Sequence, residues 1–262
     1  MRVNTPHGEL FVYTGAREHK PNQPAVVFVH GTGMDHTVWV LPSRYFARHG
    51  YNVLSLDLPG HGKSGGNPVS TIDEMADAVA EVMEATGIAN AALVGHSMGS
   101  LVTLSAAARY PDRARALVLI GTTVPMGVHP AMMTSAANND HDVIDMITYW
   151  GYSKSAQLGG NENPGMWMAG STLRLLEKAK KDVIHLDLKA CEDYSTGQEH
   201  GRSVRCPTLF ILGDRDIMTP MRSAKTLVDT ISNAKVCRMT KTGHSLMMEK
   251  PDALLDALIT IV

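Results

Sequence analysis

The chain has 262 residues, of which 44% are apolar and 19% are charged, and its formal net charge at pH 7 is −2. This composition is that of an ordinary globular protein, and the small net charge gives no electrostatic case for a nucleic-acid partner or an anionic membrane. No stretch approaches the roughly 18 consecutive apolar residues of a membrane span, and the first residues lack the apolar run of a signal peptide. We therefore expect a cytoplasmic protein without a membrane span.

Apolar strands alternate with amphipathic helices along most of the chain. Strands are predicted over residues 9–13, 25–29, 53–56, 91–94, 116–120, 208–212 and 235–239. Helices are predicted over residues 38–48, 72–86, 101–109, 221–231 and 253–261. Fully apolar segments such as 25–29 are typical of strands buried on both faces of a parallel sheet. The repeated alternation predicts right-handed crossovers and an α/β fold with a mostly parallel sheet covered by helices on both faces.

This alternation stops between Gly121 and Ser203. The intervening segment is rich in methionine and carries predicted helices over residues 142–150, 171–181 and 182–194. A structureless loop of roughly eighty residues is improbable inside a compact protein. We therefore predict an α/β core formed by residues 1–122 and 204–262, with a helical cap inserted at residues 123–203.

The segment 95–99 reads Gly-His-Ser-Met-Gly and lies between the predicted strand 91–94 and the predicted helix 101–109. A Gly-x-Ser-x-Gly between a strand and a helix is the nucleophile elbow, in which the serine occupies a sharp, strained turn. Close packing of strand against helix leaves room only for very small residues two positions on either side. The first N–H groups of the helix carry partial positive charge and point at whatever the serine attacks.

Four further motifs stand at predicted strand ends. They are His30-Gly31-Thr32-Gly33, Asp57-x-Pro-Gly-x-Gly-x-Ser64, Gly213-Asp214-Arg215-Asp216 and Gly243-His244. Together with the elbow, and in this order, they make the chain resemble the α/β-hydrolase family over nearly its whole length, with small capped esterases and related hydrolases closest. The resemblance implies an eight-stranded core sheet with the chemistry at the carboxyl ends of the strands, where ligands generally bind in open α/β sheets.

The resemblance also implies a catalytic triad in the chain order nucleophile, acid, histidine. Ser97 is the predicted nucleophile, and it needs a positioned base because a serine hydroxyl is barely acidic. His244 is the predicted base, since it follows the last strand by a short loop. Asp214 and Asp216 compete for the acid. The family pattern Gly-x-x-Asp favours Asp216, and Asp214 is then expected to bind loop backbone or solvent.

Two backbone N–H groups are predicted to bind the oxyanion that forms when an ester carbonyl is attacked. The elbow supplies the N–H of Met98, and the family's His-Gly-x loop implies the N–H of Thr32 as the second donor. Thr32 could instead contribute its hydroxyl or be an inert turn residue. A serine at position 97 favours acyl chemistry, because the related dehalogenases and epoxide hydrolases use an aspartate at the elbow.

The other histidines receive structural interpretations. His30 is expected to bond neighbouring backbone, His96 to pack against the adjacent strand and His61 to fix the geometry of its loop. Asp57 ends a strand and is expected to support the turn that follows. The remaining histidines of the cap and its approaches are expected on the solvated surface: His36, His129, His141, His185 and His200.

Methionine and tryptophan side chains near the predicted catalytic loops define the expected pocket. Its predicted lining residues are Met34, Met126, Met146, Trp150, Trp167, Met218 and Met247. Methionine also fills irregular cores, and about half of the sixteen methionines are expected to do only that. No cationic anchor for a charged substrate is evident, so we predict an apolar substrate.

The sequence contains no complete motif for binding a metal or a cofactor. The three cysteines have no paired spacing, which argues against disulfides and a zinc site, and no His-x-x-x-His or carboxylate cluster suggests a catalytic metal. Residues 60–64 end like a phosphate-binding loop, but Asp57 stands where its first glycine is required. The pair Gly31 and Gly33 lacks the third glycine of a dinucleotide fingerprint. We predict neither a metal nor a cofactor.

The predicted function is a serine hydrolase that acts through an acyl-enzyme on a small-to-medium, largely apolar carboxylic ester, thioester or lactone. A monomer or a homodimer is expected. One alternative is different chemistry on the same triad, as in a C–C hydrolase, a lyase, a perhydrolase or an acyltransferase. The other alternative is a ligand-sensing protein with little turnover.

Overall fold

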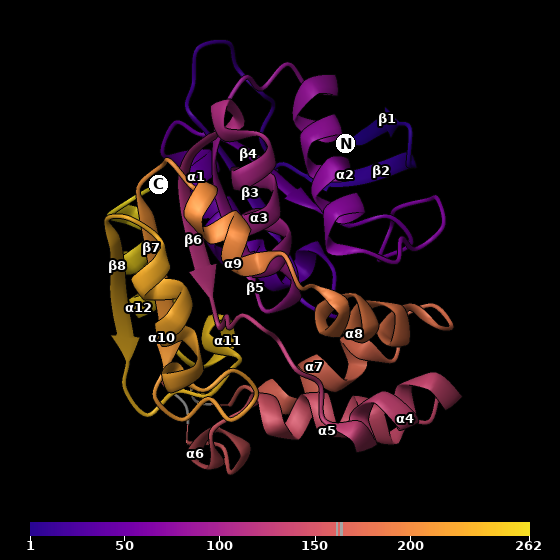
Figure 1. Ribbon diagram of the computed structural model, residues 1–262. Coiled ribbons are helices and arrows are strands. Elements are labelled where there is room, and N and C mark those ends of the chain that lie inside the picture. Colours follow the sequence, from indigo (N-terminus) through magenta and orange to yellow (C-terminus); the bar gives the residue numbers. More distant parts are fainter. Residues whose placement is uncertain (161, 163–164) are drawn as a thin grey trace.

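The computed structural model describes residues 1–160, 162 and 165–262. The described strands form one eight-stranded sheet in the order β1-β2-β4-β3-β5-β6-β7-β8 (Figure 1). Their bounds are β1 Arg2–Thr5, β2 Gly8–Tyr13, β3 Ala25–Val29, β4 Asn52–Leu56, β5 Ala91–His96, β6 Ala114–Ile120, β7 Thr208–Gly213 and β8 Ala234–Met239. The first two strands are antiparallel to their neighbours, and all other pairs are parallel. The predicted α/β fold with a mostly parallel sheet is confirmed.

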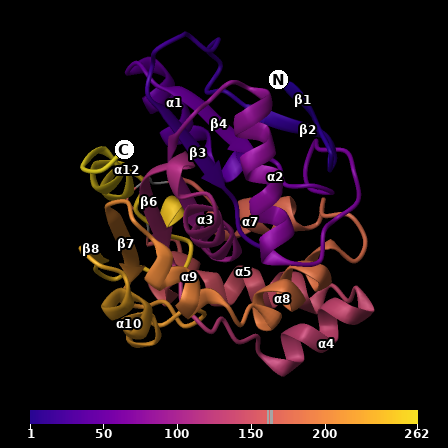
Figure 2. The ribbon, with the colours of Figure 1, turned by 45° about the horizontal axis from the view of Figure 1, so that its top comes forward.

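Helices cover both faces of this sheet, as Figure 2 shows with α2 and α3 on one side and α1 and α12 on the other. These helices and their neighbours are η1 His36–Trp39, α1 Val40–Arg48, α2 Ile72–Ala85, α3 Met98–Arg109, η2 Pro111–Arg113, α10 Met221–Thr230, α11 Leu246–Glu249 and α12 Pro251–Ile259. Alternate strand residues serve the two faces: Val27 and Val29 pack with α2 and α3, whereas Val26 and Phe28 pack with η1 and α1. Burial on both faces explains why a central strand such as β3 is apolar throughout.

Six helices lie between β6 and β7 in the described part of the chain. They are α4 Pro130–Asn138, α5 Asp142–Gly151, α6 Lys154–Gln157, α7 Met168–Leu176, α8 Val183–Asp193 and α9 Gly197–Ser203. An apolar cluster joins α4, α5, α7 and α8, which lie beyond the carboxyl ends of the strands (Figure 1). In contrast, α9 packs along α3 and α10. The division into a core and a cap at residues 123–203 stays a prediction.

The core elements match the predicted ranges to within a few residues, but several short elements were not predicted. The strand β1 has the polar sequence Arg-Val-Asn-Thr and pairs only with β2 in the sheet. The helices α6 and α11 are each four residues long, too short for an apolar period to stand out. No helix in the described ranges is long and apolar enough to span a membrane.

Candidate active site

The elbow joins the end of β5 to the start of α3. Ser97 has φ +53° and ψ −123°, a backbone conformation that a non-glycine residue adopts only under strain. A Cβ at Gly95 would lie 2.0 Å from the carbonyl oxygen of Gly99, and a Cβ at Gly99 would lie 2.3 Å from that of Val29. The two glycines are therefore required by contact between backbones.

His244 and Asp216 form a buried pair at the ends of the last two strands. The Nδ1 of His244 lies 2.8 Å from the Oδ2 of Asp216. The Oδ1 of Asp216 accepts hydrogen bonds from the backbone N–H groups of Met218, at 2.9 Å, and Thr219, at 2.8 Å. Burial opposes ionisation, but His244 and the hydrogen bonds from Thr219 lower the pKa of Asp216 to about 2.

An ionised Asp216 fixes the tautomer of His244. The carboxylate can only accept, so Nδ1 of the imidazole carries the proton and Nε2 keeps its lone pair. This Nε2 is buried and has no hydrogen-bond partner among the described residues. The ring can thus accept a proton at Nε2.

The other candidate acid, Asp214, lies away from the imidazole. Its Oδ2 pairs with the guanidinium of Arg238 at 3.1 Å, and its Oδ1 lies 3.9 Å from the Nε of Arg215. Of the two aspartates, Asp216 is the one that the structure brings to His244.

Two further residues shape the surroundings of the imidazole. Thr219 donates its hydroxyl to Asp216 Oδ2 at 2.7 Å, and its Oγ1 lies 3.1 Å from His244 Nδ1. Gly121, which follows β6, has φ +56°, and a Cβ there would lie 3.0 Å from the imidazole ring. Thr219 was not predicted. Its signal is an aspartate followed three residues later by threonine, just before the proline at 220, an arrangement typical of side-chain-closed turns.

We expect Thr219→Val to lower kcat by about 3- to 10-fold with little change in KM. Valine keeps the shape of threonine but removes the hydroxyl that orients Asp216, a hydrogen bond to a charged group of a kind worth about 1.5–3 kcal/mol. Only part of this energy is expected in kcat, because two backbone N–H groups still orient the carboxylate. Steady-state hydrolysis of a chromogenic ester measures the effect. Thr226→Val, on the exposed face of α10, is the matched control, and equal kinetics in the two variants would contradict a role for the hydroxyl.

His30 supports the loop that follows β3. Its Nδ1 lies 2.9 Å from the carbonyl oxygen of Gly31, to which it must donate, and its Nε2 accepts the N–H of Leu58 at 3.2 Å. Both interactions require a neutral ring with the proton on Nδ1. Burial, together with the neighbouring His61, lowers the pKa of His30 to about 4. The predicted bond of His30 to neighbouring backbone is confirmed.

The same loop lies against the elbow, and hydrogen bonds fix the direction of one of its peptides. The carbonyl of Gly31 also accepts the N–H of Met34 at 3.1 Å, so two hydrogen bonds fix the direction of this carbonyl. Because the peptide is planar and trans, the N–H of Thr32 points the opposite way. A Cβ at Gly31 would lie 3.2 Å from the Cβ of Ser97, so the loop lies directly against the elbow. The N–H of Met98, in the first turn of α3, has no partner within the helix.

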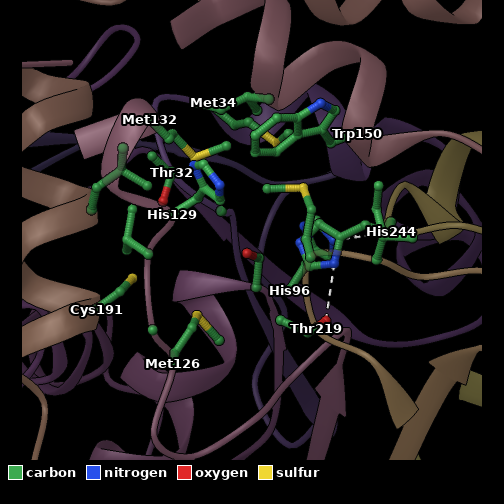
Figure 3. Close-up of a pocket in the computed structure, with 18 residues that line it drawn as sticks. Thr32, Met34, His96, Met126, His129, Met132, Trp150, Cys191, Thr219 and His244 are labelled. Atoms are coloured by element: carbon green, nitrogen blue, oxygen red, sulfur yellow. Dashed lines mark hydrogen bonds between the residues drawn. The ribbon is translucent and has the colours of Figure 1, made fainter. Parts of the chain in front are cut away.

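His96 packs beneath the His244 loop as well as ending β5. Its Nε2 donates to the carbonyl oxygen of His244 at 2.9 Å, and the two ring centroids are 4.7 Å apart (Figure 3). Its Nδ1 is buried without a hydrogen-bond partner among the described residues. Burial and the neighbouring His244 lower the pKa of His96 to about 3, so the ring stays neutral.

Asp57 supports its turn, as predicted. Its carboxylate accepts the N–H groups of His36, at 2.6 Å, and Lys63, at 2.8 Å, as well as the Nδ1–H of His36 at 2.8 Å. The placement of His36 on the solvated surface was wrong, because this contact buries the ring. Asp35, His36 and Asp57 bring potential metal ligands within 4.8 Å of one another, but His36 and Asp57 already satisfy each other.

Glu249 connects the His244 loop to the helical segment. Its Oε1 accepts the N–H groups of Gly243 and Ser153, each at 3.0 Å, and its Oε2 accepts the Ser153 hydroxyl at 2.6 Å. Burial raises the pKa of this carboxyl above its ordinary value. Ser153 immediately precedes α6, so one buried carboxyl joins this short helix to the loop that carries His244.

A cavity of about 390 Å³ opens over these loops (Figure 3). It is lined by Gly31, Thr32, Met34, His96, Ser97, Met126, Gly127, Val128, His129, Met132, Ile147, Trp150, Leu188, Cys191, Ile217, Met218, Thr219 and His244. Four predicted pocket residues are among them, namely Met34, Met126, Trp150 and Met218. The other three lie elsewhere: Met146 in the apolar cluster of the helical segment, Trp167 largely exposed, and Met247 in the core beside α12.

The cavity wall is mostly apolar and carries no lysine, arginine, aspartate or glutamate among the described lining residues. Burial raises the pKa of the Cys191 thiol above its usual range, so this side chain stays protonated and is a poor nucleophile. The arrangement therefore allows nucleophilic attack by a hydroxyl on a neutral, apolar molecule.

Comparison with known proteins agrees with this geometry. Residues 24–156 match the family described as alpha/beta hydrolase fold. The chain belongs to the α/β-hydrolase fold family. The matched residues include β3, β4, β5 and β6 and the elbow between β5 and α3.

Individual relatives are named for different activities. A pimeloyl-[acyl-carrier protein] methyl ester esterase of Aromatoleum aromaticum is 27% identical, covering 88% of this chain and 95% of that protein. A 2-hydroxy-6-oxononadienedioate/2-hydroxy-6-oxononatrienedioate hydrolase of Burkholderia vietnamiensis is 29% identical, covering 84% and 80%. The enol-lactonase from Burkholderia xenovorans LB400 has a TM-score of 0.89 at 20% identity, covering 100% and 99%. That likeness shows a shared fold.

Proposed function

We propose that the protein is a serine hydrolase that cleaves small-to-medium, largely apolar carboxylic esters, with thioesters and lactones as related substrates. One observation carries the proposal. The unpartnered Nε2 of His244, with its tautomer fixed by Asp216, and the strained Ser97 both face the same apolar cavity. That the chain works as a cytoplasmic monomer or homodimer, without metal or cofactor, stays a prediction.

In the proposed mechanism Ser97 attacks the ester carbonyl while His244 takes the hydroxyl proton at Nε2. Such general-base assistance typically contributes about 10²–10⁴-fold. The N–H groups of Met98 and Thr32 receive the negative charge on the carbonyl oxygen, and each such donor is worth on the order of 3 kcal/mol. His244 then gives its proton to the leaving alcohol, which leaves an acyl-enzyme. A water molecule, activated by the same imidazole, releases the acid.

The cavity supports a neutral substrate. Its volume of about 390 Å³ and its methionine, leucine and tryptophan lining suit an apolar acyl or alcohol group of modest size. The dioate that the Burkholderia vietnamiensis relative is named for carries two carboxylates, and the described lining offers no lysine or arginine to pair with them. We propose that residues 123–203 form a cap that closes over this substrate.

Chromogenic esters of graded acyl length, from acetate to decanoate, test this proposal. We expect turnover with a maximum at short-to-medium chains, and its loss in Ser97→Ala. Rapid, stoichiometric labelling by an organophosphonate should disappear in the same variant. Activity confined to anionic substrates would contradict the proposed specificity.

The same experiment separates the alternatives. Labelling of Ser97 without hydrolysis of any ester would favour a C–C hydrolase, lyase, perhydrolase or acyltransferase. Neither labelling nor turnover would favour a ligand-sensing protein.

A further inference from the structure

A buried carboxylate on α8 contacts the loop that carries Thr32. Asp187 is fully buried, and its Oδ2 accepts the backbone N–H of Gly33 at 2.8 Å. The same oxygen lies 2.9 Å from the Nε2 of His61. Its Oδ1 has no hydrogen-bond partner in the described ranges, so both interactions of this carboxylate fall on one oxygen.

The contacts of His61 require a charged imidazole. Its Nδ1 lies 3.0 Å from the carbonyl oxygen of Pro59, which can only accept. Its Nε2 faces the carboxylate of Asp187, which also accepts when ionised. Both ring nitrogens must therefore donate, which only the protonated ring can do. Burial acts in the opposite direction, but Asp187 raises the pKa of His61 above its ordinary value.

The neighbours of the His61 ring include one neutral imidazole and two carboxylates. His30 packs against His61 with ring centroids 4.9 Å apart and is neutral, because its own contacts admit one proton. Asp57, at the end of β4, and Asp187, on α8, supply the negative charges that act on His61. The charge of His61 is thus balanced from both the sheet side and the α8 side.

The contact with Asp187 completes the support of the loop that lies against Ser97. On the sheet side, His30 fixes the carbonyl of Gly31 and hence the direction of the Thr32 N–H. On the other side, Asp187 fixes the next peptide through the Gly33 N–H. Gly33 has φ +66° and no room for a side chain, because a Cβ there would lie 2.8 Å from Ile184, also on α8. One helix therefore holds this loop by a hydrogen bond and by close packing.

We propose that Asp187 is a positioning residue that, with protonated His61, holds the Thr32–Gly33 peptide in place and thereby aims the Thr32 N–H at the oxyanion. The kinetic part of this inference rests on the proposed ester hydrolysis. Its structural part, the hydrogen bond to Gly33 and the charge on His61, does not depend on any substrate.

Two variants separate the hydrogen bond from the charge. Asp187→Ala removes both. Asp187→Asn keeps an amide oxygen that can accept the Gly33 N–H but removes the negative charge beside His61. Asp193→Asn is the matched control, because Asp193 lies on the same helix and pairs with Lys189 on the surface. Thermal unfolding of each variant checks that it is folded.

Kinetics with the best chromogenic ester provide the first readout. We expect Asp187→Ala to lower kcat by about 10- to 100-fold, part of the 10²–10³-fold lost with a whole oxyanion donor, and to change KM by less than about threefold. Asp187→Asn should lower kcat less than Asp187→Ala does. A loss confined to KM, or a kcat for Asp187→Ala within twofold of that of Asp193→Asn, would overturn the positioning role.

Nuclear magnetic resonance gives a second readout that needs no substrate. The Gly33 amide should exchange with solvent faster in Asp187→Ala than in the wild type, and the His61 imidazole should titrate at lower pH in Asp187→Asn. Unchanged exchange and unchanged titration would refute the inference even if the esters are hydrolysed. If no ester is hydrolysed but both changes occur, the proposed function fails while the link from α8 to the loop stands.

Discussion

Asp216→Asn is expected to lower kcat for ester hydrolysis by about 10⁴-fold, as loss of the orienting carboxylate does in established serine triads. Asparagine preserves the shape of the side chain but can donate as well as accept. His244 can then hold its proton on Nε2 and present the lone pair of Nδ1 to the amide. In that tautomer the imidazole cannot accept the proton of Ser97.

Asp214→Asn is the matched control, since it makes the same chemical change two residues away. The Asp214 side chain pairs with Arg238 and does not contact His244, so kcat is expected to stay within about twofold of the wild type. Thermal unfolding of both variants shows whether a loss reflects catalysis or folding. Equal and mild losses in the two variants would remove Asp216 from the proposed triad.

The second large effect concerns stability in acid. His30 and His96 are fully buried, and their pKa values are lowered to about 4 and about 3, whereas an unfolded histidine titrates near 6.5. Between about pH 6 and 4.5 the unfolded chain therefore binds about two more protons than the folded one. Because stability falls with falling pH where the unfolded state binds more protons, we expect a loss of roughly 2–3 kcal/mol per pH unit.

Urea unfolding between pH 7 and 4.5 measures this slope. His61 does not contribute below about pH 6, since its pKa is raised and it is protonated in both states there. Asp216, whose folded pKa is about 2, adds its own loss only below about pH 4, near the unfolded value. His30→Asn should be less stable at pH 7 but show about half the slope. An unchanged slope in this variant would contradict a neutral, buried His30.

The core sheet could be predicted from the sequence because a strand buried on both faces leaves a continuous apolar run, as in residues 25–29. The strand β1 could not, because its polar sequence lies at the edge of the sheet and carries no such pattern. In the helical segment, α5 and α8 could be predicted from the helical spacing of their apolar residues. The helices α4 and α9 escaped prediction because small residues such as alanine and glycine dominate their buried faces.

Residues of the candidate site were predictable where chemistry leaves a local motif. Ser97 and His244 each stand beside glycines that the backbone contacts require, so their neighbourhoods are recognisable in sequence. Asp187 has no such signature. Its contact with His61 joins residues 126 positions apart and depends on how α8 packs on the core. Thr219 lies close to Asp216 in sequence, yet its contact with His244 exists only after β7 and β8 pair.

The bond network of Glu249 limits how freely the specificity of this enzyme can be re-engineered. Segments between β6 and β7 are natural units for exchange between relatives, since they enter and leave the fold at one edge of the site. A graft that lacks a serine at position 153 would remove the hydroxyl that donates to Glu249 Oε2, while the backbone N–H groups of residues 153 and 243 would still donate to Oε1. An unsatisfied buried group costs about 1–3 kcal/mol, and here that penalty falls on the loop that carries His244. A chimera with a well-fitting pocket would therefore lose turnover unless the grafted segment keeps Ser153 or Glu249 is replaced at the same time.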